Sequence, residues 1–179
     1  MPPTTPYAVV LGDLEPGAAM LASTDRFRTV AGAWTPAEFE RSLAPGKWTA
    51  RQILIHLAQT ELALGNRARM ALATSNYAAQ AFDQDRWMAI ESGRSGLSAD
   101  LSAEARSAKA DGLSGADALH ALLALVTMNR VLFAALSPAD LATPFSHPEY
   151  GALTVDWIVH QLAGHQIHHL TQLEAIAAR

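Results

Sequence analysis

The chain has no cysteine among its 179 residues. This absence excludes disulfides, cysteine-ligated zinc, iron–sulfur clusters and a cysteine nucleophile. Charge is also sparse, since Asp, Glu, Lys and Arg make up 17% of the residues and the formal net charge is −4. A mildly acidic chain without a basic stripe is not typical of nucleic-acid-binding proteins. The N-terminal segment has neither a basic stretch nor an apolar stretch of signal-peptide length, so we expect a cytoplasmic protein.

Long uninterrupted apolar runs are missing as well. The most apolar stretch, residues 118–136, carries four polar side chains, His120, Thr127, Asn129 and Arg130. A lipid-facing helix would tolerate this set poorly. We therefore expect a buried helix of a bundle there and no membrane partner. Because this helix is apolar on more than one side, we also expect it to contribute to a homodimer.

Helix formers dominate what is present, and half of all residues are hydrophobic. Periodic apolar patterns predict four long helices, over residues 16–33, 49–74, 115–136 and 153–178. Thr49, followed three residues later by Gln52, is typical of a capping box at the start of the second of these. No strand alternation, internal repeat or low-complexity linker is evident. The sequence predicts an all-α four-helix bundle in a single domain, residues 1–179.

The segments between the long helices are less regular. Residues 1–15 are rich in proline and are expected to be irregular. Short additional helices are expected to begin at Pro36, with Thr35 as N-cap, and within residues 82–96 and 97–112. Residues 136–153 contain three prolines and are expected to form a loop.

Histidines gather near the C-terminus, where four of the seven lie within residues 160–169. On a helical wheel, His165 and His169 fall on the apolar side, whereas His168 lies at its margin and His160 nearly opposite. Two imidazoles four residues apart on a helix can reach one metal ion. His56, at the edge of the apolar stripe of the second long helix, is a candidate third ligand. From the pattern alone, buried structural histidines remain the alternative to a metal site. The other four histidines, His120, His147, His160 and His168, are expected on the surface, in a loop or next to the ligands without binding the ion.

Two segments that carry these histidines resemble a known family. Residues 45–61, "PGKWTARQILIHLAQTE", and residues 165–173, "HQIHHLTQL", resemble the conserved segments of the DinB-like (DinB/YfiT) superfamily of four-helix proteins. The resemblance implies a bundle with up-down-down-up helix order and a divalent metal held by His56, His165 and His169. It also implies that Gln172, which lies close to His165 on the wheel, supports the ligands. This chain departs from the thiol-transferase subset at Gly164, where those relatives carry Trp; a glycine there either relieves crowding or permits close packing.

The same resemblance implies a chemistry. Family members include metal-dependent transferases that use a low-molecular-weight thiol such as bacillithiol or mycothiol, so a small-molecule thiol and an electrophilic substrate are the expected partners. Three neutral imidazoles would leave an open position on the ion, which suits catalysis. Zn, Ni, Fe and Mn remain open as the ion, and no catalytic residue is assigned, although Glu61 and Gln59 are candidates for acid–base help. A metal-dependent hydrolase, a non-catalytic metal-binding stress-response protein and a bundle without metal remain alternatives.

Overall fold

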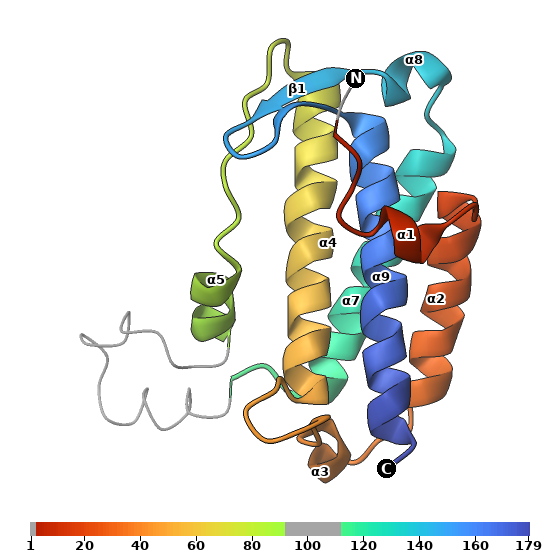
Figure 1. Ribbon diagram of the computed structural model, residues 1–179, viewed down its shortest axis with the longest axis vertical. Helices are drawn as coiled ribbons and strands as arrows, with labels where there is room; N and C mark the ends of the chain where they lie inside the picture. The colour runs from red at the N-terminus through yellow and green to blue at the C-terminus, as the bar shows by residue number, and fades with distance from the viewer. Residues whose placement is uncertain (1–2, 92–111) are drawn as a thin grey trace.

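Four long helices form the body of the computed structural model, which describes residues 3–91 and 112–179 (Figure 1). They are α2 (Pro16–Ala31), α4 (Ala50–Ala73), α7 (Gly115–Ala134) and α9 (Val155–Ala177). Helices α2 and α9 run in one direction and α4 and α7 in the other, which is the expected up-down-down-up order. Helix α9 packs against α2 and α4, and α7 packs against the same two helices from the other side.

Polar caps fix where the two site-bearing helices begin. The hydroxyl of Thr49 accepts a hydrogen bond from the backbone N–H of Gln52 at 3.3 Å, and the Gln52 side chain accepts one from the Thr49 backbone at 3.0 Å. The predicted capping box is therefore confirmed. Thr154 caps α9 in the same manner through the backbone N–H of Trp157, at 3.3 Å. These caps fix the residues at which the two helices begin, and the apolar side chains of each helix determine which face packs into the core.

Apolar side chains from all four helices fill the centre of the bundle. The largest that are fully buried on these helices are Met20, Phe27, Leu54, Ile55, Leu57, Leu122, Ile158, Leu162, Leu173 and Ile176. Burial of each such side chain contributes about 1.5–3 kcal/mol before conformational entropy is counted. Within the described residues, α7 is the one helix that is long and apolar enough to cross a membrane, with a mean hydropathy of 1.3 over 18 residues. Its packing against α2 and α4 is that of the bundle helix expected from the sequence.

Short elements complete the fold, and those in two segments correct the sequence-based expectation. Residues 1–15 are not wholly irregular, because α1 (Ala8–Leu11) forms there and packs against α9. Residues 136–153 are not a plain loop, because they contain α8 (Pro138–Leu141) and a hairpin of β1 (Pro144–His147) and β2 (Gly151–Thr154). The hairpin is antiparallel, and the buried residues Phe145 and Leu153 face each other in its register.

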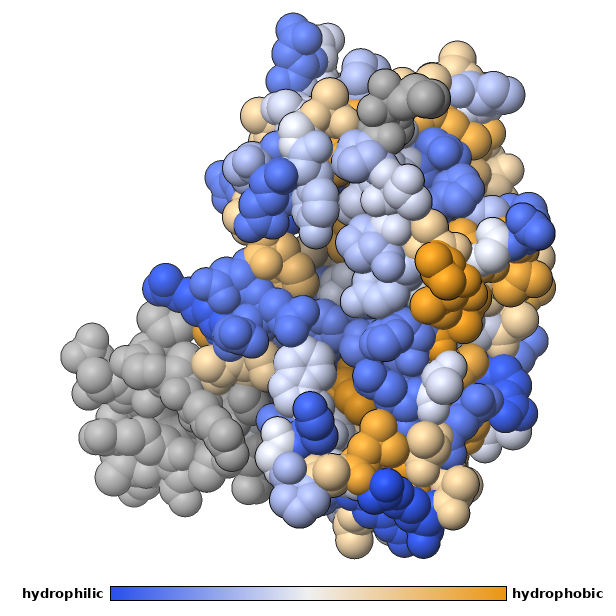
Figure 2. Space-filling model, viewed as in Figure 1, coloured by the Kyte–Doolittle hydropathy of each residue, from blue (hydrophilic) through white to orange (hydrophobic). Residues whose placement is uncertain are grey.

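The remaining short helices follow the sequence more closely. Helix α3 (Pro36–Phe39) begins after the Thr35 cap, and α5 (Gln84–Glu91) lies within the predicted range 82–96. The helix expected over residues 97–112 lies outside the described residues except for its last position. On the face shown in Figure 2, polar side chains cover most of the surface, and apolar side chains are exposed in separate small groups.

Candidate metal centre

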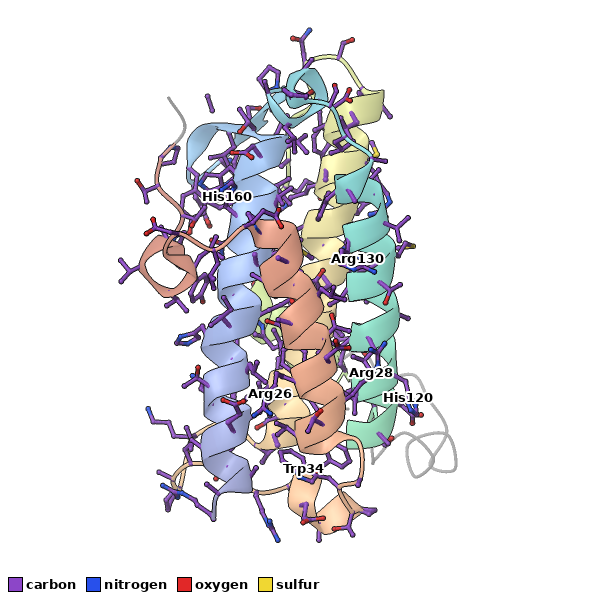
Figure 3. All side chains as sticks on the ribbon, turned by 90° about the vertical axis from the view of Figure 1, so that its right-hand side faces the viewer. Arg26, Arg28, Trp34, His120, Arg130 and His160 are labelled. Carbon is purple, nitrogen blue, oxygen red and sulfur yellow. The ribbon has the colours of Figure 1, made fainter. Side chains whose placement is uncertain are left out.

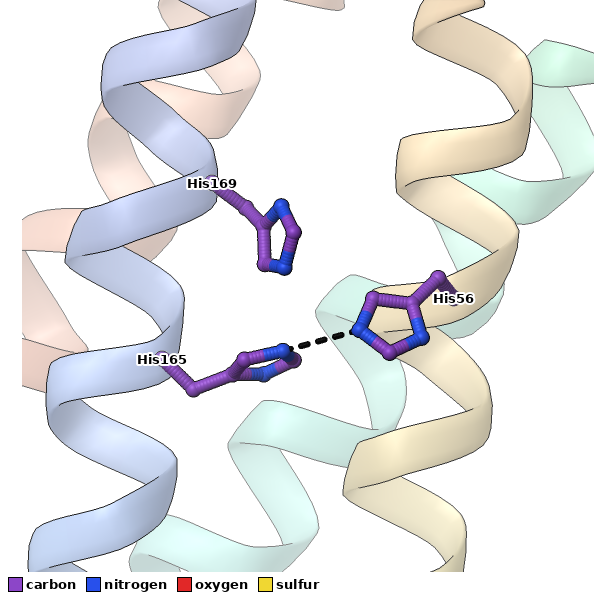
Figure 4. Close-up of side chains that lie close together, drawn as sticks. All are labelled: His56, His165 and His169. Atoms are coloured by element: carbon purple, nitrogen blue, oxygen red, sulfur yellow. Dashed lines mark hydrogen bonds between the residues drawn. The ribbon is translucent and has the colours of Figure 1, made fainter. Parts of the chain in front are cut away.

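Three histidines from two helices converge inside the bundle (Figure 4). His56 comes from α4, and His165 and His169 come from α9, with only 4%, 3% and 6% of their surfaces exposed. The Nε2 atoms of His56 and His165 are 2.9 Å apart, and one ring nitrogen from each of the three histidines lies within 4.8 Å of the others. The expected inward orientation of all three is confirmed. By contrast, His120 and His160 lie on the outside of the bundle (Figure 3).

The three imidazoles are held in their neutral form. Burial lowers the pKa of His56 to about 3 and that of His169 to about 4, and the neighbouring histidines contribute to both shifts. Burial also lowers the pKa of His165 well below its usual value. A neutral imidazole offers one lone pair, which is the form that binds a metal. At neutral pH the cluster therefore presents lone pairs rather than positive charges.

The converging ring nitrogens are better suited to bind a cation than to form hydrogen bonds with one another. Two neutral imidazoles can share one N–H across the 2.9 Å contact, but the Nδ1 atoms of both His56 and His165 are buried and have no partner within the described residues. An ion bound at the Nε2 atoms would leave these two Nδ1 atoms unpaired as well, so the support for a cation comes from the converging nitrogens. Three ring nitrogens that converge on one small space match the set that binds Zn²⁺ and similar ions.

Gln172 supports the cluster through His169. Its Oε1 accepts a hydrogen bond from Nδ1 of His169 at 2.8 Å, and its Nε2 lies 3.3 Å from Nε2 of His168. The first bond fixes the proton of His169 on Nδ1 and leaves its Nε2 lone pair free for a ligand. The helical wheel placed Gln172 beside His165, but its contact is with His169, because residues three apart meet on a helix surface.

The N-terminal segment forms one wall of the cluster because Gly164 makes room for it. The ring of Tyr7 lies 5.1 Å from that of His165 and 5.2 Å from that of His168, measured between centroids. A Cβ atom on Gly164 would lie 2.8 Å from both the Cβ and the carbonyl oxygen of Tyr7, closer than real contacts allow. Of the two explanations offered for this glycine, close packing is the one observed. Trp48 covers the opposite side, with its ring 5.0 Å from that of His56.

A pocket of about 280 Å³ leads from the surface to His56 and His165. The hairpin contributes His147, Glu149 and Tyr150 to its lining. His147 was expected on the surface, in a loop or near the ligands; it lies in β1 and is 6% exposed, and its Nδ1 accepts hydrogen bonds from the backbone of Glu149 and Tyr150 at 3.2 and 3.4 Å. Nothing in the local sequence signals this burial, because it arises when the hairpin folds over the ends of α4 and α9.

Glu61 belongs to the core rather than to the histidine cluster. Its carboxylate accepts hydrogen bonds from the side-chain amides of Asn129 at 2.8 Å and Gln166 at 2.6 Å, which joins α4 to α7 and α9. Complete burial raises the pKa of Glu61 to about 7, against the effect of both hydrogen bonds. Gln59 is also buried, and neither polar atom of its side chain has a partner within the described residues. Neither residue contacts the three histidines through a hydrogen bond, so the acid–base role considered for them has no support here.

A bundle of this topology with a buried tris-histidine cluster at the foot of a pocket defines a candidate metalloprotein of the four-helix class. The chain belongs to the DinB superfamily, whose family model matches residues 19–173. It is similar in fold to YfiT from Bacillus subtilis, described as a probable metal-dependent hydrolase with an unusual four-helix bundle topology. The two structures superpose with a TM-score of 0.72 at 16% identity, over 92% of this chain and 85% of YfiT.

Relatives at the sequence level carry the provisional name metal-dependent hydrolase. One from Oceanobacillus iheyensis is 25% identical over 142 residues, which is 79% of this chain and 72% of the relative. A second from the same organism is 24% identical over 151 residues, or 84% of this chain and 77% of the relative. A third, from Bacillus mycoides, is 25% identical over 134 residues, or 75% of this chain and 67% of the relative.

Proposed function

We propose that His56, His165 and His169 together bind one divalent metal ion. The observation that carries this proposal is the convergence of three buried, neutral imidazoles, whose ligand nitrogens lie within 4.8 Å of one another. The bond from His169 to Gln172 supports it, because it holds the proton of that ring on Nδ1 and leaves the Nε2 lone pair available to a ligand. Imidazole ligands suit Zn, Ni and Fe, so the ligand set alone does not choose among these ions.

We further propose that the protein is an enzyme which transfers a low-molecular-weight thiol to a small electrophile. A divalent ion held by three histidines has at least one open position, and its charge would favour the thiolate form of a bound thiol, which is the nucleophile. The pocket at His56 and His165 gives a small molecule access to the cluster. Because the chain has no cysteine, the sulfur would have to come from a diffusible cosubstrate.

The surroundings of the cluster favour a thiol over water as the nucleophile. Metalloproteases that activate water place a glutamate beside the ion as general base. Here Glu61 is held by Asn129 and Gln166 and is not available as such a base, and Glu149 is the one carboxylate among the described residues that line the pocket. A thiol loses its proton far more readily than water and has less need of such a base.

Hydrolysis is the second candidate, and two observations favour it. The relatives from Oceanobacillus and Bacillus are provisionally named as hydrolases. Glu149 also lines the pocket and offers a carboxylate that could accept a proton from water. A reaction with water as the only nucleophile would distinguish hydrolysis from thiol transfer.

The metal proposal is tested by a pair of neighbouring variants. His169→Ala should lose stoichiometric metal, measured by elemental analysis of untagged protein, because it removes a ligand. His168→Ala is the matched control and should keep the ion nearly intact, since its ring lies at the margin of the cluster. Equal loss in both variants would contradict the assignment of His169 as a ligand.

The chemical proposal is tested with the metal-loaded protein. It should accelerate the reaction of bacillithiol, mycothiol or a surrogate thiol with an electrophile such as monochlorobimane, relative to the chelated protein. His56→Ala should abolish this acceleration and keep the helical circular dichroism. If no thiol reacts faster while the ion is shown to be bound, and an ester or amide panel is hydrolysed instead, the hydrolase candidate replaces the transferase.

A further inference from the structure

One cation lines the pocket at a distance from the histidine cluster. Arg67 lies on α4, eleven residues beyond His56, and the side chains of Thr60 and Leu64 line the pocket between them. Spacings of four, four and three residues keep all of these on one face of the helix. At 1.5 Å per residue, the backbone positions of His56 and Arg67 are roughly 16 Å apart along the axis of α4. The pocket thus has a histidine end and an arginine end.

The Arg67 guanidinium is oriented by the protein but is not neutralised by contact. Its Nη2 donates a hydrogen bond to the backbone carbonyl of Gln80 at 2.5 Å, which fixes one edge of the group. No ion pair between Arg67 and a carboxylate occurs in the described part of the chain, although Glu149 acts on it electrostatically from a distance. Partial burial lowers the pKa of Arg67, which is the effect of removing water from a cation. A desolvated guanidinium with unused N–H groups is well suited to bind an anion.

The overall charge of the pocket lining also favours the binding of an anion. Among the described residues that line the pocket, Arg67 and Glu149 are the only Lys, Arg, Asp or Glu, so their charges cancel. His147 is neutral near pH 7, because burial and then the charge of Arg67 lower its pKa. A divalent ion on three neutral histidines would add two positive charges at the other end. The loaded pocket would therefore attract a negatively charged molecule.

We propose that Arg67 binds an anionic group, a carboxylate in the simplest case, on the thiol that occupies the pocket with its sulfur toward the histidine cluster. This assignment rests on the proposed thiol function and specifies its substrate class as an anionic thiol. A planar guanidinium recognises a carboxylate through two parallel hydrogen bonds, which a neutral hydroxyl group cannot match. The anionic group and the sulfur are separated by several bonds, since they lie at opposite ends of the pocket.

The test measures binding rather than turnover. Protein loaded with Co²⁺ is titrated with mercaptohexanoate and with mercaptohexanol, and thiolate binding is followed by the thiolate-to-cobalt charge-transfer absorption. The wild type should bind the carboxylate at least about tenfold more tightly than the alcohol, as expected for a charged hydrogen-bonded pair. The preference should decrease at high salt, because screening weakens the attraction.

Variants of Arg67 identify the source of that preference. Arg67→Met should bring the two affinities to within about twofold of each other, and Arg67→Lys should restore part of the difference because it keeps the charge. Arg26→Met is the matched control, since Arg26 lies on the outer surface of α2 and pairs with Glu174 (Figure 3). A preference that survives in Arg67→Met, or that is absent from the wild type, would overturn the assignment.

If the proposed thiol function is wrong, the results differ from those expected when only the Arg67 assignment is wrong. If neither thiol produces the absorption band although Co²⁺ is bound, the proposed thiol function is wrong. Arg67 is then tested with hexanoate, whose binding is followed by the fluorescence of Trp157 on the pocket wall. Quenching that is lost in Arg67→Met but kept in Arg26→Met would support an anion site for another substrate, and equal quenching in both would reject it.

Discussion

Glu61→Gln should make the stability of the protein less dependent on pH. Glu61 is fully buried, and its pKa is raised from 4.5 in an ordinary setting to about 7 in the fold. A raised carboxyl pKa means that the folded state holds its proton where the unfolded state has lost it. The contribution of Glu61 is therefore present below about pH 4.5 and is lost as the pH rises through about 7. Glutamine carries no charge at any of these pH values.

The size of this effect follows from the shift. A difference of 2.5 pKa units between about 7 and 4.5 corresponds to roughly 3 kcal/mol at 1.36 kcal/mol per unit. The glutamine variant should therefore gain up to roughly 3 kcal/mol relative to the wild type between acidic and mildly alkaline pH. Its new amide group needs an acceptor where Gln166 now donates. The Oε1 of Gln166 is buried and has no partner within the described residues, so rotation of the Gln166 amide would supply one.

The assay is urea denaturation of the chelated protein at several pH values between about 5 and 8. The histidines titrate in both proteins and cancel when the two free energies of unfolding are subtracted. Glu174→Gln is a suitable control, because its exposed ion pair with Arg26 contributes at most about 1 kcal/mol. Parallel curves of unfolding free energy against pH for the wild type and Glu61→Gln would refute the raised pKa of Glu61.

Three further predictions concern the ion, the N-terminal segment and the oligomeric state. Chelation should leave helical circular dichroism unchanged, because the apolar core forms without the ion; a large loss of signal would contradict this. Gly164→Ala should destabilise the protein by about 1–3 kcal/mol in chemical denaturation, since the new Cβ meets Tyr7 at 2.8 Å, although alanine is the better helix former. A neutral or stabilising effect would mean that the segment moves aside freely. Light scattering should give about twice the chain mass of 19.1 kDa, through the exposed Met128 and Val131 of α7, and a monomer mass would reject the homodimer.

The long helices and the phase of the histidines were predictable because local rules decide them. Thr49 and Gln52 cap α4 through neighbours in the sequence, and the apolar stripe beside His56 determines that this face of the helix packs into the core. His165 and His169 lie four residues apart on a strongly apolar helix, so the helical wheel alone placed both inward. These interactions involve residues close in sequence, which is why the sequence was sufficient.

The hairpin and α1 were missed because contacts distant in sequence decide them. Each strand has four residues, too few to show a reliable alternation. Ser146 donates to the carbonyl of Tyr77 at 3.0 Å and accepts from Ala79 at 2.8 Å, which adds a segment from beyond α4 to the hairpin. The burial of His147 depends on that assembly. No pattern within residues 136–153 could therefore have revealed that the hairpin forms part of the pocket.

At Gly164, a feature visible in the sequence is explained by a contact with a residue distant in sequence. From the sequence it is a departure from the Trp of the related transferases, with two explanations that a single chain cannot separate. In the fold, its missing side chain allows the backbone of Tyr7 to lie against α9, so that an aromatic ring from the N-terminal segment covers His165. The space beside His165 is thus occupied by an aromatic ring that comes from a distant part of the sequence. Because Tyr7 also lines the pocket, a substitution at either position would change the surroundings of the histidine cluster and the pocket together.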